Sequence, residues 1–234
     1  MRPSSYLQRR DQITTYFDET AAAAWQALTS NAPVSRVRAT VRAGRDDMRN
    51  TLLDWLPDDL SGKTVLDAGC GTGALAVDAA KRGASVIAID VASNLIGVAR
   101  ERAAEQEFSG EIDFRVGDML ADAPAEVDHI VAMDSLIHYA AVDVNKVVAE
   151  FAGRARNSVL FTAAPWTPSL ALMHFVGRRF ARSSNRAPAI EPVRINRLLE
   201  NLDESLSDDG WSIGRTERIK SGFYISQAVE LKHS

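Results

Sequence analysis

The segment VLDAGCGTGALA, residues 65–76, decides the fold. Its apolar residues end at Asp67, glycines follow at alternate positions (Gly69, Gly71 and Gly73), and small helix-favouring residues come next. This order predicts a strand, a tight turn and a helix N-terminus, the arrangement with which doubly wound α/β sheets bind nucleotide-like ligands. Glycine suits the turn because the backbone must reverse sharply and approach the ligand closely.

Asp67 indicates which ligand the turn binds. Gly71, Gly73 and Ala76 also match the dinucleotide pattern G-x-G-x-x-G/A, so a nicotinamide site stays open on pattern alone. A carboxylate here would repel a pyrophosphate, whereas it would attract the ammonium and sulfonium groups of S-adenosylmethionine. The D-x-G-x-G-x-G form resembles motif I of the class I S-adenosylmethionine-dependent methyltransferases, which implies that cofactor. The predicted cofactor residues of this segment are Asp67, Gly69, Cys70, Gly71 and Gly73.

The composition is that of a globular protein. The chain has 234 residues, 46% hydrophobic and 25% charged, which suits one α/β domain with an insertion. A net charge of −4 gives no reason to expect nucleic acid as a partner. No apolar run reaches the roughly 18 residues of a transmembrane helix, and the N-terminus lacks a secretory signal. Cys70, the single cysteine, is expected to be a small turn residue rather than a nucleophile, and it indicates a reducing, cytoplasmic compartment.

Strands and helices alternate from residue 64 onward. The predicted strands are 64–67, 86–90, 112–116, 129–133 and 158–163. Helices are predicted between them, including 95–106 after a cap at Ser93 and 144–155 after Asp143. Continuous apolar strands separated by helices indicate a parallel sheet covered on both faces.

The C-terminal part changes character. Segments 211–220 and 223–232, joined by Ser221-Gly222, predict an antiparallel hairpin. Five parallel strands closed by such a hairpin form the seven-stranded Rossmann-like sheet of class I methyltransferases. The ranges assigned to this core are 61–166 and 207–234.

Two segments lie outside the predicted core. Residues 1–60 form an N-terminal arm, with a helix at 46–56. Residues 167–206 contain a helical pair, 169–180 and about 192–206. We expect this pair to cap the carboxyl edge of the sheet, where ligands bind in such folds.

Acidic residues follow the predicted strands. Asp90 has the position of a ribose ligand, with a helix cap as the alternative. In methyltransferases the acid at Asp118 reaches the adenine amino group and Met119 packs on the ring; a surface turn is the alternative. Asp134 either faces the cofactor's ammonium group or caps a turn. The remaining predicted cofactor residues are Val91 and Met133.

Arginines gather in the arm and the cap. A solvated face explains most of them, yet arginines beside aromatic residues suit a flat apolar ligand that carries carboxylates. Spacing alone does not choose among them. The arginines of the arm are Arg36, Arg38, Arg42, Arg45 and Arg49, and those of the cap are Arg178, Arg179, Arg182, Arg186, Arg194 and Arg197.

Several longer segments are similar to one family. The most specific are MDSLIHY at 133–139, RAPAI at 186–190 and GFYIS at 222–226, and the similarity extends over nearly the whole chain. On these segments the chain resembles the magnesium-protoporphyrin IX O-methyltransferases of chlorophyll and bacteriochlorophyll synthesis. The resemblance implies methyl transfer to one propionate, with the monomethyl ester and S-adenosylhomocysteine as products.

The same resemblance implies roles for individual residues and partners. Tyr16 and His138 match active-site positions, and the arm is expected to be a mobile lid. No catalytic metal is implied, because magnesium belongs to the substrate. The large porphyrin-binding subunit of magnesium chelatase is the implied partner, and peripheral association with the photosynthetic membrane stays open. The predicted substrate contacts are Tyr139, Met173, Phe175, Arg178 and Arg179.

Three alternatives remain at this stage. A methyltransferase for another ring substrate, such as a quinone, would share the cofactor motif. A porphyrin-binding scaffold without catalysis is a second alternative, against which the intact turn with Asp90 and Asp118 argues. A nicotinamide oxidoreductase is the third, and Asp67 argues against it.

Overall fold

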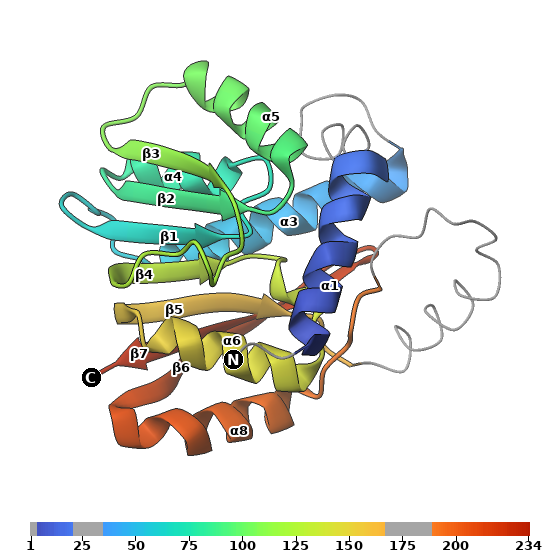
Figure 1. Cartoon of the computed structure of the whole chain (residues 1–234), viewed down its shortest axis with the longest axis vertical. Coiled ribbons are helices and arrows are strands. Elements are labelled where there is room, and N and C mark those ends of the chain that lie inside the picture. Colours follow the sequence, from blue (N-terminus) through green and yellow to red (C-terminus); the bar gives the residue numbers. More distant parts are fainter. Residues whose placement is uncertain (1–3, 21–34, 167–188) are drawn as a thin grey trace.

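The computed structural model describes residues 4–20, 35–166 and 189–234. Its centre is a seven-stranded sheet with the order β3-β2-β1-β4-β5-β7-β6 (Figure 1). The strands are β1 (Thr64–Ala68), β2 (Ser85–Asp90), β3 (Glu111–Val116), β4 (Val127–Ala132), β5 (Ala155–Ala163), β6 (Trp211–Ser221) and β7 (Tyr224–His233). Neighbours from β3 to β5 are parallel, and β7 runs antiparallel to β5 and β6. The predicted seven-stranded class I methyltransferase sheet is confirmed.

The central strands are apolar because helices cover both faces of the sheet. Every residue of β4 is buried. In the neighbouring β1, Leu66 pairs with Ile87 of β2 on one side and with Ile130 of β4 on the other. Burial on both faces explains why the strands read as continuous apolar runs.

One face is covered by α3 (Arg36–Asp54), α4 (Ala74–Lys81) and α5 (Ser93–Ala104). Met48, Leu75 and Ile96, one from each helix, belong to the same buried cluster. The prediction for α3 began ten residues too late: Ser35 caps this helix by accepting the backbone N–H of Arg38, but the buried residues, from which the sequence pattern was read, begin only at Gly44.

The other face is covered by α6 (Ala141–Ala152) and α8 (Ile195–Leu206). The predicted start of α6 was three residues too late, and its predicted end at 155 was wrong because Ala155 begins β5. For α8 the expectation of a cap over the carboxyl edge was wrong. Its apolar side, Leu198 and Leu202, packs against α6 and β6, so the helix flanks the sheet instead (Figure 1). The cap prediction for 167–188 lies outside the described residues.

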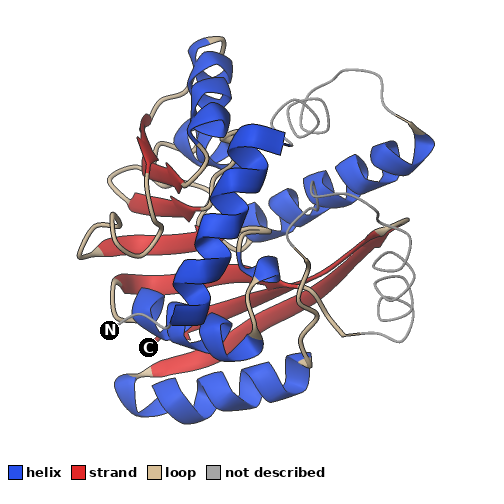
Figure 2. Ribbon diagram, turned by 45° about the vertical axis from the view of Figure 1, so that its right-hand side comes forward, coloured by secondary structure: helices blue, strands red, loops and turns tan. Residues whose placement is uncertain are grey.

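Helix α1 (Ser4–Thr15) lies across the carboxyl ends of the parallel strands and continues into the π-helical turn η1 (Tyr16–Thr20) (Figures 1 and 2). Polar contacts dock it: Ser5 Oγ donates to Asp143 at 2.9 Å, and Arg9 pairs with Glu191 at 2.6 Å. Tyr6 is only 1% exposed. The N-terminal helix is therefore part of the packed structure. None of the described helices is both long and apolar enough to cross a bilayer.

Candidate active site

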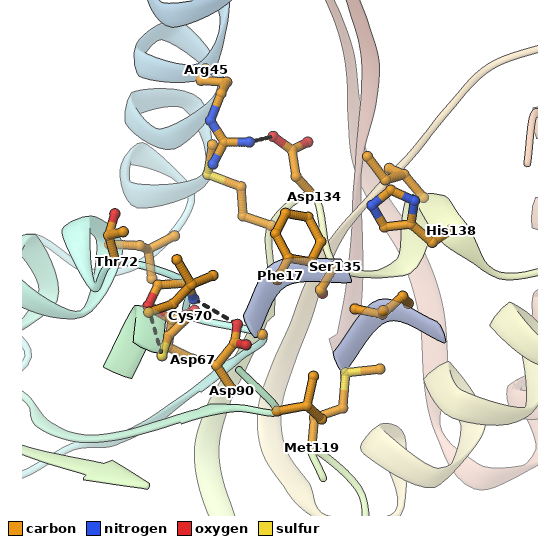
Figure 3. A pocket seen from close by; sticks show the side chains of 18 of the residues that line it. Phe17, Arg45, Asp67, Cys70, Thr72, Asp90, Met119, Asp134, Ser135 and His138 are labelled. Carbon is orange, nitrogen blue, oxygen red and sulfur yellow. Dashed lines mark hydrogen bonds and ion pairs between the residues drawn. The ribbon is translucent and has the colours of Figure 1, made fainter. Parts of the chain in front are cut away.

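A cavity of about 600 Å³ opens at the carboxyl ends of β1, β2 and β4 (Figure 3). The strand order changes direction between β1 and β4, which is where open α/β sheets bind ligands. Residues of α1, η1, α3 and the short 3₁₀ helix η2 (Leu136–His138) complete the walls. The predicted cofactor residues that line this cavity are Asp67, Gly69, Cys70, Gly71, Asp90, Val91, Met119, Met133 and Asp134.

The glycine-rich turn has the backbone that only glycine adopts readily. Gly69, Gly71 and Gly73 have φ angles of 82°, 55° and 77°. A Cβ atom added at Gly69 would lie 2.4 Å from the Cβ of Ser135. Gly73 forms the N-cap of α4 behind the cavity rather than lining it. Burial raises the pKa of the Cys70 thiol, which agrees with a structural turn residue and not with a nucleophile.

Asp67 faces the cavity with a carboxylate of which one oxygen has no hydrogen-bond donor, although the Ala76 backbone N–H donates to the carboxylate. The residue is 2% exposed, and its Oδ2 atom accepts no hydrogen bond in the described structure. Burial and the nearby Asp90 charge raise the pKa of Asp67 to about 7. A buried carboxylate oxygen without a donor is costly unless a ligand compensates it. This oxygen therefore fits a ligand with a positive charge, such as the ammonium or sulfonium of S-adenosylmethionine.

The affinity for S-adenosylmethionine is expected to fall as pH decreases below about 7. Binding of a cation favours ionised Asp67, so the affinity changes by up to about tenfold per pH unit in this range. The contribution of Asp67 to the free energy of unfolding changes with pH in the opposite direction. Because the folded state holds this proton to higher pH than an unfolded Asp with a pKa of 3.8, this stabilising contribution is complete below pH 3.8 and is lost as the pH rises through about 7.

Calorimetric titrations from about pH 5.5 to about pH 8.5 measure this linkage. Asp67→Asn should remove most of the pH dependence of the affinity, and comparing the wild type with this variant cancels the contribution from titration of the ligand itself. The exposed Asp47→Asn on α3 is the control and should keep the wild-type profile. Equal profiles for wild type and Asp67→Asn would contradict the assigned role.

Asp90 holds the turn as well as facing the cavity. Its Oδ2 accepts the backbone N–H of Gly71 at 2.8 Å, and its Oδ1 accepts that of Ala92 at 2.9 Å. The second bond caps the start of α5, so the predicted cap at Ser93 was wrong: Ser93 is already the first helical residue. Both suggested roles for Asp90 remain compatible, since the residue caps the helix and still lines the cavity; the ribose contact stays a prediction.

Asp118 is a connection point between the cavity wall and α1. Its Oδ1 accepts the backbone N–H groups of Leu120 and Ala121, and its Oδ2 accepts from Tyr6 at 3.2 Å and from Arg10 at 3.1 Å. Met119 lines the cavity beside it, as predicted for a residue that packs on adenine. The predicted adenine contact of Asp118 stays untested, but its alternative as a plain surface turn does not describe a buried carboxylate with these partners.

Removal of the Arg10 charge is expected to loosen α1. In Arg10→Gln the buried Asp118 carboxylate loses a charged donor, an effect of about 1–3 kcal/mol. Hydrogen exchange of residues 4–20, followed by mass spectrometry, should accelerate about tenfold or more. Gln8→Ala, at an exposed position of the same helix, is the control. Equal exchange in the two variants would contradict a role of Asp118 in holding α1.

Asp134 has a role that neither of its predicted readings describes. Among the described residues, Asp134 alone of the non-glycine residues has a positive φ angle, 53°. Arg45 of α3 pairs with Oδ2 at 2.5 Å, Tyr224 of β7 donates to Oδ1 at 3.0 Å, and Thr162 of β5 lies 3.3 Å from Oδ1. Its side chain is 4% exposed. The carboxylate thus ties three elements together at the end of β4, and an ammonium contact stays an untested prediction.

The structure brings the predicted catalytic residues Tyr16 and His138 to the same cavity. The Phe17 ring contacts both: its centroid lies 5.1 Å from that of the Tyr16 ring, edge-on, and 6.3 Å from that of the His138 ring. Figure 3 shows Phe17 and His138 on the same side of the cavity. The His138 Nδ1 atom lies 3.4 Å from the Ala189 carbonyl oxygen. The arrangement places a phenol, a phenyl ring and an imidazole beside the cavity, which suits orientation of a polar group next to an apolar one.

Of the predicted substrate contacts, Tyr139 lines the cavity, but its ring is buried and stacks on Tyr6 at 5.0 Å. Met173, Phe175, Arg178 and Arg179 lie outside the described residues. The prediction had missed several cavity residues. They include Tyr6, Ile13, Phe17, Ser135, Ile137 and Ile190. For Phe17, its place beside Tyr16 was the available signal.

Comparisons with known proteins agree with this geometry. Residues 132–233 match the family described as "Magnesium-protoporphyrin IX methyltransferase C-terminus", and residues 65–157 match a "Methyltransferase domain". The "Magnesium-protoporphyrin O-methyltransferase" of Rhodobacter capsulatus is 42% identical over 231 residues, which cover 98% of this chain and 99% of that protein.

Similarity also extends to a solved structure. The crystal structure of magnesium protoporphyrin IX methyltransferase from Synechocystis PCC 6803 with bound SAH has a TM-score of 0.82 at 26% identity, covering 96% of this chain and 99% of that one. By contrast, a "Ubiquinone biosynthesis O-methyltransferase" of Xylella fastidiosa is 45% identical over only 82 residues, 34% of this chain and 32% of that protein. The likeness to the quinone enzymes is thus confined to part of the chain, whereas the likeness to the porphyrin enzymes covers nearly all of it.

Proposed function

The chain belongs to the magnesium-protoporphyrin O-methyltransferase family, and we propose that it transfers a methyl group from S-adenosylmethionine to a propionate carboxylate of magnesium-protoporphyrin IX. The products are the monomethyl ester and S-adenosylhomocysteine, in a step of chlorophyll or bacteriochlorophyll synthesis. The observation that supports this activity most directly is the unpartnered Oδ2 of Asp67 in the glycine-lined cavity.

The residues of the cavity fit S-adenosylmethionine. The turn at Gly69 and Gly71 lets the backbone approach the ligand, and Asp67 supplies the negative charge that its cationic end requires. We assign the ribose to Asp90 and the adenine ring to Met119, both of which line the cavity. When bound, this cofactor supplies a methyl group on a positively charged sulfur, which is a good leaving group.

The substrate carboxylate needs no general base. By analogy with glutamate, a propionate has a pKa of about 4–5 and is already ionised near neutral pH. The residues of the chain then position one carboxylate oxygen in line with the methyl group and keep water away from it. We assign the positioning to Tyr16 and His138, and the exclusion of water to Phe17, whose ring packs against both.

Incubation of the protein with magnesium-protoporphyrin IX and S-adenosylmethionine labelled in the methyl group tests the proposal. We expect one label per porphyrin, recovered as a carboxylate ester that mild alkali hydrolyses. A matched incubation with a catechol-type quinone precursor should give no labelled product. Labelling of the quinone precursor alone, or of neither compound, would contradict the proposal.

We also propose that the large porphyrin-binding subunit of magnesium chelatase delivers the substrate. The family resemblance supports this partner. An exposed apolar pair supports a contact near the cavity: Val37 and Phe223 are 50% and 59% exposed, and they flank the close approach of Gly222 to Thr40. Addition of the porphyrin-loaded subunit should accelerate methylation relative to free porphyrin. Val37→Ser/Phe223→Ser, which removes the apolar surface without adding charge beside the cavity, should remove the acceleration but leave the reaction with free porphyrin unchanged, and a retained acceleration would contradict this contact.

A further inference from the structure

The arginines of the cavity line one of its walls; of the acids that line it, Asp134 and Asp46 pair with arginines of that wall. Asp67 and Asp90 lie at the carboxyl ends of β1 and β2, where the cofactor turn is. The opposite wall is one face of α3, and Figure 3 shows Arg45 of this helix across the cavity from Asp90. The arginines of α3 that line the cavity are Arg38, Arg42, Arg45 and Arg49. Their spacing of four, three and four residues places them on one side of the helix.

The two inner arginines are held by acids of the fold. Arg45 pairs with the buried Asp134, and Arg49 pairs with Asp46 at 2.8 Å and with Asp78 at 2.9 Å. The Arg45 and Arg49 side chains are 19% and 22% exposed. Arg45 therefore attaches α3 to the end of β4, and Arg49 attaches it to α4.

Helix α3 is fixed in position beside these ion pairs. A Cβ atom added at Gly44 would lie 2.6 Å from a ring carbon of Tyr224, so helix and hairpin are in close contact there. The same Tyr224 donates to Asp134. The outer arginines Arg38 and Arg42 are thus presented from a rigid element, and Arg38 also lies in the first turn, where the helix dipole adds positive potential.

We propose that Arg38 and Arg42 bind the carboxylate of the substrate that is not methylated. This inference rests on the proposed function, since it requires a substrate with two carboxylates. Arg45 lies over Asp134 at the end of β4, close to where the reacting carboxylate must meet the methyl group. Along the helix axis, Arg42 lies about 5 Å and Arg38 about 10 Å from Arg45 toward the N-terminus of α3.

The chemistry favours this division of the two carboxylates. A guanidinium group binds a carboxylate through two parallel hydrogen bonds, which fixes its position well. The same pairing would weaken the attacking oxygen as a nucleophile, so it suits the carboxylate that does not react. Binding one propionate on α3 directs the other toward Tyr16 and His138, and it selects dicarboxylates over monocarboxylates.

The test compares two substrates across wild type and four variants. The substrates are magnesium-protoporphyrin IX and an analogue in which an ethyl group replaces one propionate. The test variant is Arg38→Gln/Arg42→Gln, beside each single substitution. Arg36→Gln is the control, because Arg36 is an exposed arginine of the same helix that does not line the cavity. Steady-state kinetics are combined with equilibrium binding followed by porphyrin absorption, with S-adenosylhomocysteine present.

In the wild type the analogue should have a KM about 10-fold to 100-fold above that of the dicarboxylate. The double variant should raise the KM and the dissociation constant of the dicarboxylate by a similar factor and leave those of the analogue unchanged, with Arg36→Gln equal to wild type. Equal effects on both porphyrins, or none on either, would overturn the inference. Wild-type methylation of neither porphyrin would instead contradict the proposed function, and the binding measurements would still decide whether these arginines hold the second carboxylate.

Discussion

Replacement of Gly69 by alanine is expected to lower the affinity for S-adenosylmethionine by at least about 100-fold. Gly69 has a φ of 82°, and an added Cβ would lie 2.4 Å from the Cβ of Ser135. The backbones of Gly69 and Ser135 are both held in place. The Gly69 N–H donates to the Ile89 carbonyl of β2, and the N–H of Asp134, next to Ser135 in the chain, donates to the Thr162 hydroxyl. The turn must therefore change shape where the cofactor approaches it. Isothermal titration calorimetry measures the loss.

Gly62→Ala is the matched control for this variant. Gly62 has a similar φ of 73°, but no atom lies within 4 Å of a Cβ added there, and it does not line the cavity. The control should lose about 1–2 kcal/mol of stability from backbone strain and keep its affinity for the cofactor. If the two variants bind S-adenosylmethionine equally well, the turn is not the cofactor site.

Replacement of His138 by alanine is expected to lower kcat by about 100-fold without abolishing the reaction. In the proposed reaction the nucleophile is already ionised, so the variant loses orientation of the carboxylate and not proton transfer. The pH profile of kcat should therefore keep its shape. Tyr16→Phe should behave in the same way, because the two side chains line one cavity and contact the same Phe17 ring.

His233→Ala is the control for the histidine. His233 packs on Trp211 at the far end of β7 and does not line the cavity, so its loss should leave kcat unchanged. Cofactor and porphyrin binding should be measured for each variant. If His138→Ala binds both ligands but reacts no faster than the uncatalysed background, His138 takes part in proton chemistry and the positioning account is wrong.

The sheet was predictable because its signals are local. The central strands β1 and β4 are almost entirely buried and were predictable as apolar segments, whereas the edge strand β3 has mostly exposed or half-buried residues. The glycines of the β1–α4 turn adopt positive φ angles, which agrees with the sharp turn that their spacing predicts. The placement of α8 was not predictable in this way. Its leucines showed that one side is buried, but a helical period does not say whether that side meets the sheet or covers the cavity.

The candidate site was predictable only in part. Asp67 and Asp90 could be assigned because a parallel sheet places strand ends at one edge. The pairing of Arg45 with Asp134 joins residues 89 positions apart, and no local pattern specifies such a contact. Tyr16 and His138 were predicted from resemblance, and the structure brings both to one cavity.

The contacts of α1 bear on how the protein is made. This helix is synthesised before the sheet that it packs against, yet its partners Asp118, Asp143 and Glu191 follow their contacts on α1 by 112, 138 and 182 positions. During synthesis α1 can therefore complete these contacts only after Glu191 has emerged from the ribosome. A nascent chain that already contains the glycine turn therefore still lacks the wall of the site that α1 supplies until these later partners have been synthesised.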